Sequence, residues 1–161
     1  MISLWRIATD SLRYAADDLS GRGALVRGGR WNEKGTPALY TSASIALACL
    51  ETLVHLGAAG LPLNRYLVRV DVDDAVWAAR QSLGAPSPGE LPVGWDAIPH
   101  GRVSVEAGQK WLASGASALL AVPSVIIPEE SNILVNPRHA DAAKLRATKL
   151  RKWIYDGRFR T

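Results

Sequence analysis

The sequence predicts an α+β fold built as one compact domain. A chain of 161 residues with 48% apolar residues can bury one core without disulfide or metal support. Short segments of strand character are mixed irregularly with three helical segments, unlike the regular alternation that builds a parallel sheet. The sequence contains no internal repeat and no low-complexity tract. We therefore expect residues 1–161 to form a single domain.

Segments of strand length run from one end of the chain to the other. They are rich in apolar and β-branched residues, and 66–72 shows a clear period of two. Pro123 and Pro128 interrupt one apolar stretch, which predicts a bend between two short strands. The predicted strands are 2–7, 38–41, 66–72, 118–122, 125–127, 131–135 and 153–155.

Three helices are predicted, at 43–57, 105–114 and 140–152. The first is rich in Ala and Leu, follows a Thr-Ser pair suited to capping, and is followed by Gly57 and Gly60 as stop signals. The last is basic and amphipathic. Residues 10–30 show no sustained period, and 83–99 hold four prolines and three glycines, which predicts a loop.

Composition excludes several classes of protein. One cysteine, Cys49, and three histidines can supply neither an intrachain disulfide nor a closed Cys/His zinc cage. The longest apolar stretch, 43–56, is interrupted by polar residues and is shorter than a membrane span. The first residues do not resemble a secretory signal. We expect a cytoplasmic protein with no metal and no membrane partner.

The formal charge of +4 is unevenly distributed. Residues 138–161 hold eight basic and two acidic side chains, a net +6, and the remaining residues carry −2. Such a segment can bind nucleic acid, bind an acidic partner, or form a solvated helix face. Charge alone does not choose among these three.

Glu51 is unusual because it is a charged residue in a predicted helix that is otherwise largely apolar. Its neighbours one turn away on the predicted helix are Leu47, Ala48, Val54 and His55. A carboxylate on a largely apolar helix is costly to bury unless it is bonded. Glu51 therefore lies either on the one exposed stripe of the helix or against a cleft.

Three further residues are candidates for chemistry. Arg30 follows Gly28 and Gly29, so its planar guanidinium sits in a loop whose backbone can approach an anion closely, although a surface turn is an equal interpretation. Tyr40 ends a strand and offers a ring face and a hydroxyl, but such residues are also common in cores. Ser124 lies in a rigid position after a proline without the glycines of a nucleophile elbow.

Taken together, the chain resembles the RES-domain family, named for an Arg, a Glu and a Ser. The ordered set of segments covers almost the whole chain, although no single piece is specific. The segments are WRI at 5–7, GGRWN at 28–32, ALYTS at 38–42, ALACLETLVHL at 46–56, VPSVIIPEESNILVNPRH at 122–139 and YDGRF at 155–159.

The resemblance implies a toxin of a type II toxin–antitoxin pair with an Xre-type antitoxin, and a fold related to diphtheria-toxin-type ADP-ribosyltransferases. It implies that the chain consumes NAD+ as a substrate, by hydrolysis, phosphorolysis or transfer of ADP-ribose to a protein. By the same resemblance Arg30, Glu51 and Ser124 are the name-giving residues and Tyr40 is an active-site tyrosine. Nucleic acid would be contacted only indirectly, through the antitoxin.

The chemistry of these residues is compatible with that role. Cleavage of the nicotinamide–ribose bond passes through an oxocarbenium-like state that a carboxylate stabilises. Glu51 would contact the ribose, Arg30 would hold phosphate or ribose, and Tyr40 would stack on nicotinamide. Ser124 would position the substrate. The remaining two candidates, for the rim of the site, are Arg6 and Asn32.

Two other classes remain open. A non-enzymatic nucleic-acid-binding domain would use the basic C-terminal segment but would leave Glu51 and the Arg30 loop without a role. A ribonuclease would need a pair of histidines or a His/Lys/Glu cluster, and the sequence gives no sign of either. The sequence does not identify the acceptor of ADP-ribose, any target protein, or the stoichiometry of the complex.

Overall fold

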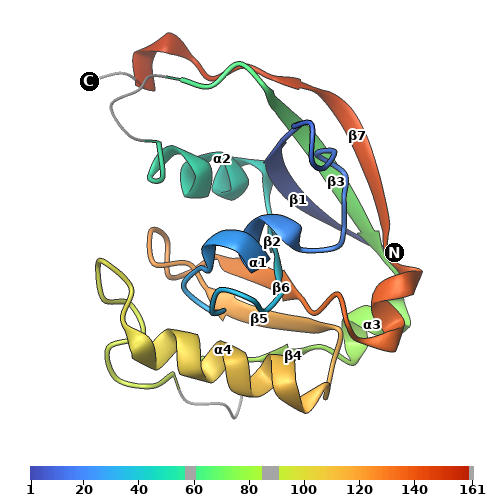
Figure 1. The fold of residues 1–161 in the computed structure, drawn as a ribbon, viewed down its shortest axis with the longest axis vertical. Helices are drawn as coiled ribbons and strands as arrows, with labels where there is room; N and C mark the ends of the chain where they lie inside the picture. The colour runs from blue at the N-terminus through green and yellow to red at the C-terminus, as the bar shows by residue number, and fades with distance from the viewer. Residues whose placement is uncertain (57–60, 85–90, 160–161) are drawn as a thin grey trace.

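The computed structural model describes residues 1–56, 61–84 and 91–159. Its framework is one mixed seven-stranded sheet with the strand order β4-β5-β6-β2-β1-β3-β7, in which β4 and β5 are parallel and the other neighbours are antiparallel (Figure 1). The strands are β1 (Ile2–Thr9), β2 (Leu39–Ser42), β3 (Arg65–Val72), β4 (Gln81–Ser82), β5 (Leu119–Pro123), β6 (Ser131–Val135) and β7 (Arg146–Trp153).

The helices are short, apart from one. Helix α4 covers one face of the β5-β6 part of the sheet, and α2 lies beside β1 and β2 (Figure 1). The helical elements are α1 (Arg22–Arg27), α2 (Ile45–Leu53), α3 (Asp74–Ala78), α4 (Arg102–Ser114) and the 3-10 turns η1 (Ala140–Lys144) and η2 (Gly157–Phe159). The α+β class predicted from the sequence is therefore confirmed.

The sheet consists of two parts that meet at β1 and β2. Strand β1 pairs with β3 along its whole length, from Ile2 opposite Val72 to Thr9 opposite Arg65. Its register with β2 is given by Trp5 opposite Ser42. The two parts of the sheet diverge from this junction (Figure 1).

Apolar side chains on both faces of the sheet form the core. One cluster lies between the two parts of the sheet and includes the buried residues Leu4, Val70 and Ile133. A second lies under α4 around Trp111 and Leu134, and a third joins α2 to β1 and β3. These clusters fix α2 and α4 on the same sheet, because each helix buries its apolar side against it.

The predicted basic helix at 140–152 is wrong. Only Ala140–Lys144 turns helically, as the 3-10 turn η1; Leu145 is buried and extended, and β7 begins at Arg146. Strand β7 pairs antiparallel with β3 and forms an edge of the sheet. Its Ala, Lys, Leu and Arg residues favour a helix locally, but pairing with β3 prevails, as tertiary context commonly overrides propensity.

Smaller differences concern the ends of elements and the loops. Residues 125–127, predicted as a strand, form a turn, and α2 ends at Leu53 rather than at 57, which lies outside the described residues. Helix α1 lies inside the segment predicted to be irregular. The structure also contains α3 and β4, which the sequence did not suggest. The predicted loop at 83–99 is confirmed where it is described; 85–90 are not described.

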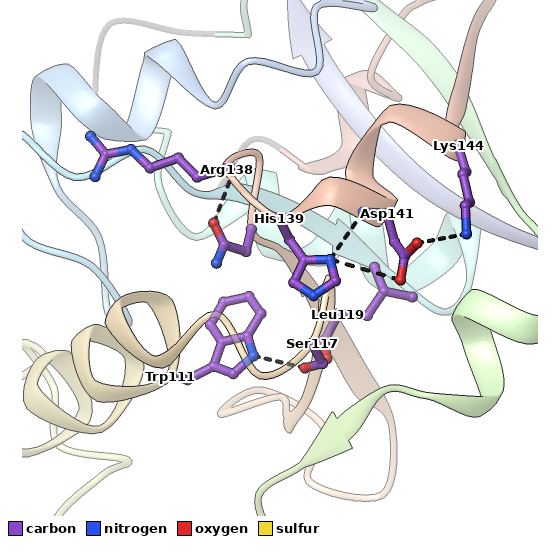
Figure 2. A network of polar contacts seen from close by, with 8 residues as sticks. Trp111, Ser117, Leu119, Arg138, His139, Asp141 and Lys144 are labelled. Atoms are coloured by element: carbon purple, nitrogen blue, oxygen red, sulfur yellow. Dashed lines mark hydrogen bonds and ion pairs between the residues drawn. The ribbon is translucent and has the colours of Figure 1, made fainter.

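A buried polar network connects the end of α4 to the strands (Figure 2). The indole Nε1–H of Trp111 donates to Ser117 Oγ at 3.0 Å, and that hydroxyl donates to the carbonyl of Leu119 at 2.8 Å. Asn136 Nδ2 donates to the carbonyl of Leu112. On the other side, His139 accepts from the backbone N–H of Asp141 and so caps η1. The network fixes α4 against the ends of β5 and β6.

No helix within the described part of the chain is long and apolar enough to cross a membrane.

Candidate functional site

Helix α2 presents Glu51 toward the sheet. The helix starts directly after β2, and Ser44 caps it by accepting the backbone N–H of Leu47 at 3.1 Å. Buried Leu47 and Ala48 pack one side of the helix on the core. Glu51 lies one turn further on and is partly buried. The structure shows that this carboxylate is hydrogen-bonded to other polar side chains, and Glu51 does not line the cavity described below.

Two donors from distant parts of the chain converge on Glu51. The hydroxyl of Ser124 donates to Glu51 Oε1 at 2.8 Å, and the side-chain amide of Asn132 donates to the same oxygen. Ser124 lies 73 residues and Asn132 81 residues from Glu51 in the sequence. The carboxylate is therefore held by β6 and by the loop after β5.

Ser124 is completely buried, and its hydroxyl takes part in three hydrogen bonds. Its Oγ also accepts the backbone N–H groups of Ile126 and Ile127, at 3.0 and 3.2 Å. These bonds form the turn found where a strand was predicted, because a serine side chain can replace backbone partners in a turn. With its proton on Glu51, Ser124 supports the carboxylate and is not arranged as a nucleophile.

Arg30 lies in the glycine-containing loop between α1 and β2. Gly28 has φ +72°, a conformation that favours glycine and turns the chain out of α1. Arg30 Nη1 donates to the carbonyls of Trp95 and Ala97 at 2.8 and 2.9 Å. Partial burial is the main cause that lowers the pKa of Arg30, and the negative charge of Glu51 opposes this effect.

The side chains of Tyr40 and Asn32 stabilise the Arg30 loop through hydrogen bonds. The hydroxyl of Tyr40 donates to Asn32 Oδ1 at 2.7 Å and accepts the backbone N–H of Trp31 at 3.0 Å. Burial is the main cause that raises the pKa of Tyr40, so the phenol stays protonated. Asn32 is 1% exposed, and its Nδ2 donates to backbone carbonyls of Ala24, Glu33 and Thr36. The structure thus places Asn32 inside the loop rather than at a rim.

Aromatic stacking connects the Arg30 loop to the loop that precedes α4. The rings of Trp31 and Trp95 stack with centroids 6.1 Å apart. Trp95 is also the residue whose carbonyl accepts from Arg30. Together the two contacts hold Arg30 between the β2 side of the site and α4.

The structure does not bring Arg6 to this group. Trp5 lies opposite Ser42, and Ser42 lies opposite Asn132, so these three side chains share the face on which Glu51 lies. Arg6, the next residue, points to the other face. There it donates to the carbonyl of Asp18 at 3.2 Å, and burial lowers its pKa to about 10.

Two histidines, His55 and His100, give no sign of a role in the sequence, because each is isolated along the chain. Partial burial, then the charges of Arg30 and His55, lower the pKa of His100. His55 follows α2 and its Nδ1 lies 2.7 Å from the carbonyl oxygen of Glu51. Both residues therefore lie on the Arg30 and Glu51 side of the fold.

A cavity of about 300 Å³ adjoins this group through His100. Glu51 and Tyr40 are not among its lining residues, so it lies beside the polar cluster and not at its centre. It is lined by Glu33, His100, Gly101, Arg102, Val105 and Glu106.

The geometry combines a held carboxylate, a guanidinium, a protonated phenol and a weakly basic imidazole. A carboxylate stabilises a developing positive charge, and a guanidinium with free N–H groups binds phosphate. Within the described residues, no group of three or more His, Cys, Asp or Glu side chains could hold a metal ion. The arrangement suits glycosyl chemistry on a charged substrate.

Known proteins resemble this chain along nearly its whole length. The model of a family described as the RES domain matches residues 3–157. A protein of Sphingobium sp. (strain YBL2), named Prs ADP-ribosylating toxin, is 58% identical over 156 residues, which cover 97% of this chain and 95% of that protein. A protein of Yersinia enterocolitica named Toxin Res is 37% identical over 127 residues, which cover 79% of this chain and 80% of that protein.

A solved structure has a similar fold. It is a chain of the crystal structure of the M. tuberculosis MbcT-MbcA toxin-antitoxin complex, with a TM-score of 0.63 and 20% sequence identity. The match covers 92% of this chain and 84% of that chain. At this identity the likeness concerns the fold.

Proposed function

Because this chain belongs to the RES domain family, we propose that it is the toxin of a toxin–antitoxin pair and that it consumes NAD+ by cleaving the nicotinamide–ribose bond. The observation that carries the proposal is the carboxylate of Glu51, held on Oε1 by Ser124 and Asn132. A fixed anion at this place stabilises the cationic ribose as the nicotinamide leaves.

Four of the candidate residues have a role in this proposal. Glu51 contacts the ribose and stabilises its developing charge. Arg30 binds phosphate or ribose through the N–H groups that do not hold the 95–97 backbone, and the ring of Tyr40 stacks on nicotinamide while its hydroxyl holds the loop. Ser124 acts through Glu51. NAD+ is the substrate, and this chemistry needs no metal.

The acceptor of ADP-ribose is proposed to be a protein. The relative with 58% identity is named for ADP-ribosylating Prs. Prs from the same cell is therefore the first acceptor to test for this chain. Water and phosphate remain the alternatives, and they give free ADP-ribose and ADP-ribose-1-phosphate.

The partner proposed is an antitoxin of the Xre type that covers the site, and the location proposed is the cytoplasm. The solved structure with the similar fold comes from a toxin–antitoxin complex. We also propose that residues 1–161 form a single RES domain related to diphtheria-toxin-type ADP-ribosyltransferases, as the sequence resemblance implies.

The test is release of nicotinamide from NAD+ by the purified protein, with and without added Prs. Wild type should release nicotinamide, and Glu51→Ala and Arg30→Ala should each lose most of the rate. Glu129→Ala is the control, because Glu129 is an exposed carboxylate in the loop between β5 and β6 that also contains Ser124. Label from adenylate-labelled NAD+ should stay on Prs if transfer occurs. Equal rates in wild type and Glu51→Ala would refute the site.

Ribonuclease activity should be measured in parallel, because a ribonuclease is one of the alternative classes considered from the sequence. RNA degraded by the purified protein while NAD+ stays intact would replace the proposed function with this one.

A further inference from the structure

The two oxygens of the Glu51 carboxylate have different surroundings. Ser124 and Asn132 both donate to Oε1. Within residues 1–56, 61–84 and 91–159, no hydrogen bond reaches Oε2. One oxygen is therefore an anchor, and the other is available to a substrate.

Asn132 is itself held in one orientation. The hydroxyl of Ser42 donates to Asn132 Oδ1 at 2.7 Å. A carboxylate can only accept, so the amide NH2 must face Glu51 and the amide oxygen must face Ser42. Ser42 is 4% exposed and lies opposite Asn132 in the β2-β6 register. The pairing of β2 with β6 thus orients the side-chain amide of Asn132 toward Glu51.

Two hydrogen-bond donors fix the orientation of the Glu51 carboxylate, which a single donor would leave free to rotate. A single hydrogen bond from Ser124 lets the carboxylate rotate about that contact, and the Glu51 side chain has several rotatable bonds. A second donor, Asn132 on β6, bonds the same oxygen and fixes the plane of the carboxylate. Oε2 then keeps one direction before any substrate arrives, which is the preorganisation that electrostatic catalysis requires.

We propose that Asn132, oriented by Ser42, is a positioning residue for the reaction, and that it fixes Glu51 so that Oε2 meets the ribose. The inference rests on the proposed function of Glu51. It adds a residue that acts through Glu51, without touching the substrate, and it assigns different tasks to the two carboxylate oxygens.

The kinetic test uses two variants of Asn132. Asn132→Asp keeps the shape but replaces the donor with an acceptor, and Asn132→Ala removes the side chain. We expect kcat for nicotinamide release to fall by about 10²-fold and KM for NAD+ to change by less than about 3-fold, because a displaced reacting group costs rate more than binding. Ser42→Ala should lower kcat by about 10-fold, since Asn132 remains but is less well aimed.

Double variants separate this chain of contacts from independent effects. Ser42→Ala should cause no further loss in the Asn132→Ala background, and Asn132→Ala no further loss in the Glu51→Gln background, because residues in one network are not additive. Thr41→Val is the matched control. Thr41 is the neighbour of Ser42 on β2 and is buried to a similar extent. Its side chain points to the other face of the sheet, and its hydroxyl donates to the backbone carbonyl of Ile133. Its kcat should stay within about 2-fold of wild type, as expected for a site outside the network.

A spectroscopic readout that does not require turnover checks the contact itself. The side-chain amide resonance of Asn132 is the one that disappears from the 1H–15N spectrum of Asn132→Asp. Bonding to a carboxylate should shift one of its protons downfield, and that proton should move upfield in Glu51→Gln and Ser42→Ala but not in Thr41→Val.

Each outcome decides a separate point. An amide resonance unaffected by Glu51→Gln overturns the contact, and a shifted resonance with an unchanged kcat in Asn132→Ala overturns the positioning role. Full additivity of Ser42→Ala and Asn132→Ala overturns the orienting role of Ser42. If Glu51→Gln keeps full activity, or wild type leaves NAD+ intact, the proposed function fails, and the positioning role fails with it even where the resonance moves as expected.

Discussion

Gly108 of α4 packs directly on the backbone carbonyl of Trp31. A methyl group at Gly108 would lie 1.9 Å from that oxygen and 2.7 Å from its carbon. The close approach of helix and loop therefore depends on the missing side chain. Because Arg30 is the residue before Trp31, the same contact sets how deep the Arg30 loop sits against α4.

Gly108→Ala should lower the stability of the protein and the activity of the site together. The backbone of Trp31 cannot move without displacing Arg30 and the Trp31–Trp95 stack. We expect a loss of about 2–3 kcal/mol in the free energy of unfolding, measured by urea denaturation, and a raised KM for NAD+. Gly157→Ala is the control, because nothing lies within 4 Å of a methyl group there. Unchanged stability in Gly108→Ala would contradict the close packing.

Tyr40 should make the protein less stable at alkaline pH. Burial raises the pKa of Tyr40 above its ordinary value, so between pH 10 and 11 the unfolded chain loses a proton that the folded chain keeps. Stability contributed by the protonated phenol is complete below the unfolded pKa and is lost as pH rises. The free energy of unfolding should fall by up to about 1.4 kcal/mol per pH unit from this group.

The comparison is with Tyr40→Phe, measured by denaturation at each pH from 8 to 11. At neutral pH this variant should be less stable by about 1–3 kcal/mol, because Asn32 Oδ1 and the N–H of Trp31 lose a partner. Its stability should then fall less steeply above pH 10 than that of wild type. Parallel pH dependences in the two proteins would show that Tyr40 ionises as easily in the fold as outside it.

Removal of the Arg30 charge should raise the pKa of His100. Arg30 lowers that pKa by repulsion of the protonated imidazole, in addition to the effect of burial. Titration of the three histidine resonances by NMR would report the change in Arg30→Met. Arg27→Met provides the comparison, since Arg27 is an exposed residue at the end of α1. A His100 titration unaffected by Arg30→Met would mean that the two groups are not neighbours in solution.

Neutralising the edge strand should leave the chemistry intact. Arg146, Arg151 and Lys152 are exposed on β7, and β1 and β3 separate β7 from β2. The triple change to Gln should therefore keep nicotinamide release within about 2-fold of wild type, as expected for distant sites. If the protein binds nucleic acid in a salt-dependent way, this triple variant should lose that binding. A large loss of NAD+ consumption would instead connect the basic strand to the site.

The sequence by itself determined much of the framework and most of the candidate residues. Alternation and β-branched content located β1, β3, β5 and β6 to within a few residues, because one or both faces of each strand lie in the core. Glu51 stood out because a carboxylate among apolar neighbours signals a special environment. Arg30 and Tyr40 were indicated by their local patterns, and the structure connects them through the Trp31 backbone.

Only the tertiary structure decided the contacts between distant segments. Strand β7 has the composition of a helix and is a strand because β3 offers it a free edge, a fact that no local window contains. Asn132 lies in an ordinary strand sequence and becomes a partner of Glu51 through the β2-β6 register. Arg6 lies in a matching motif, but the alternation of β1 turns it to the opposite face. Local pattern specifies which residues can do chemistry, and strand pairing determines which of them meet.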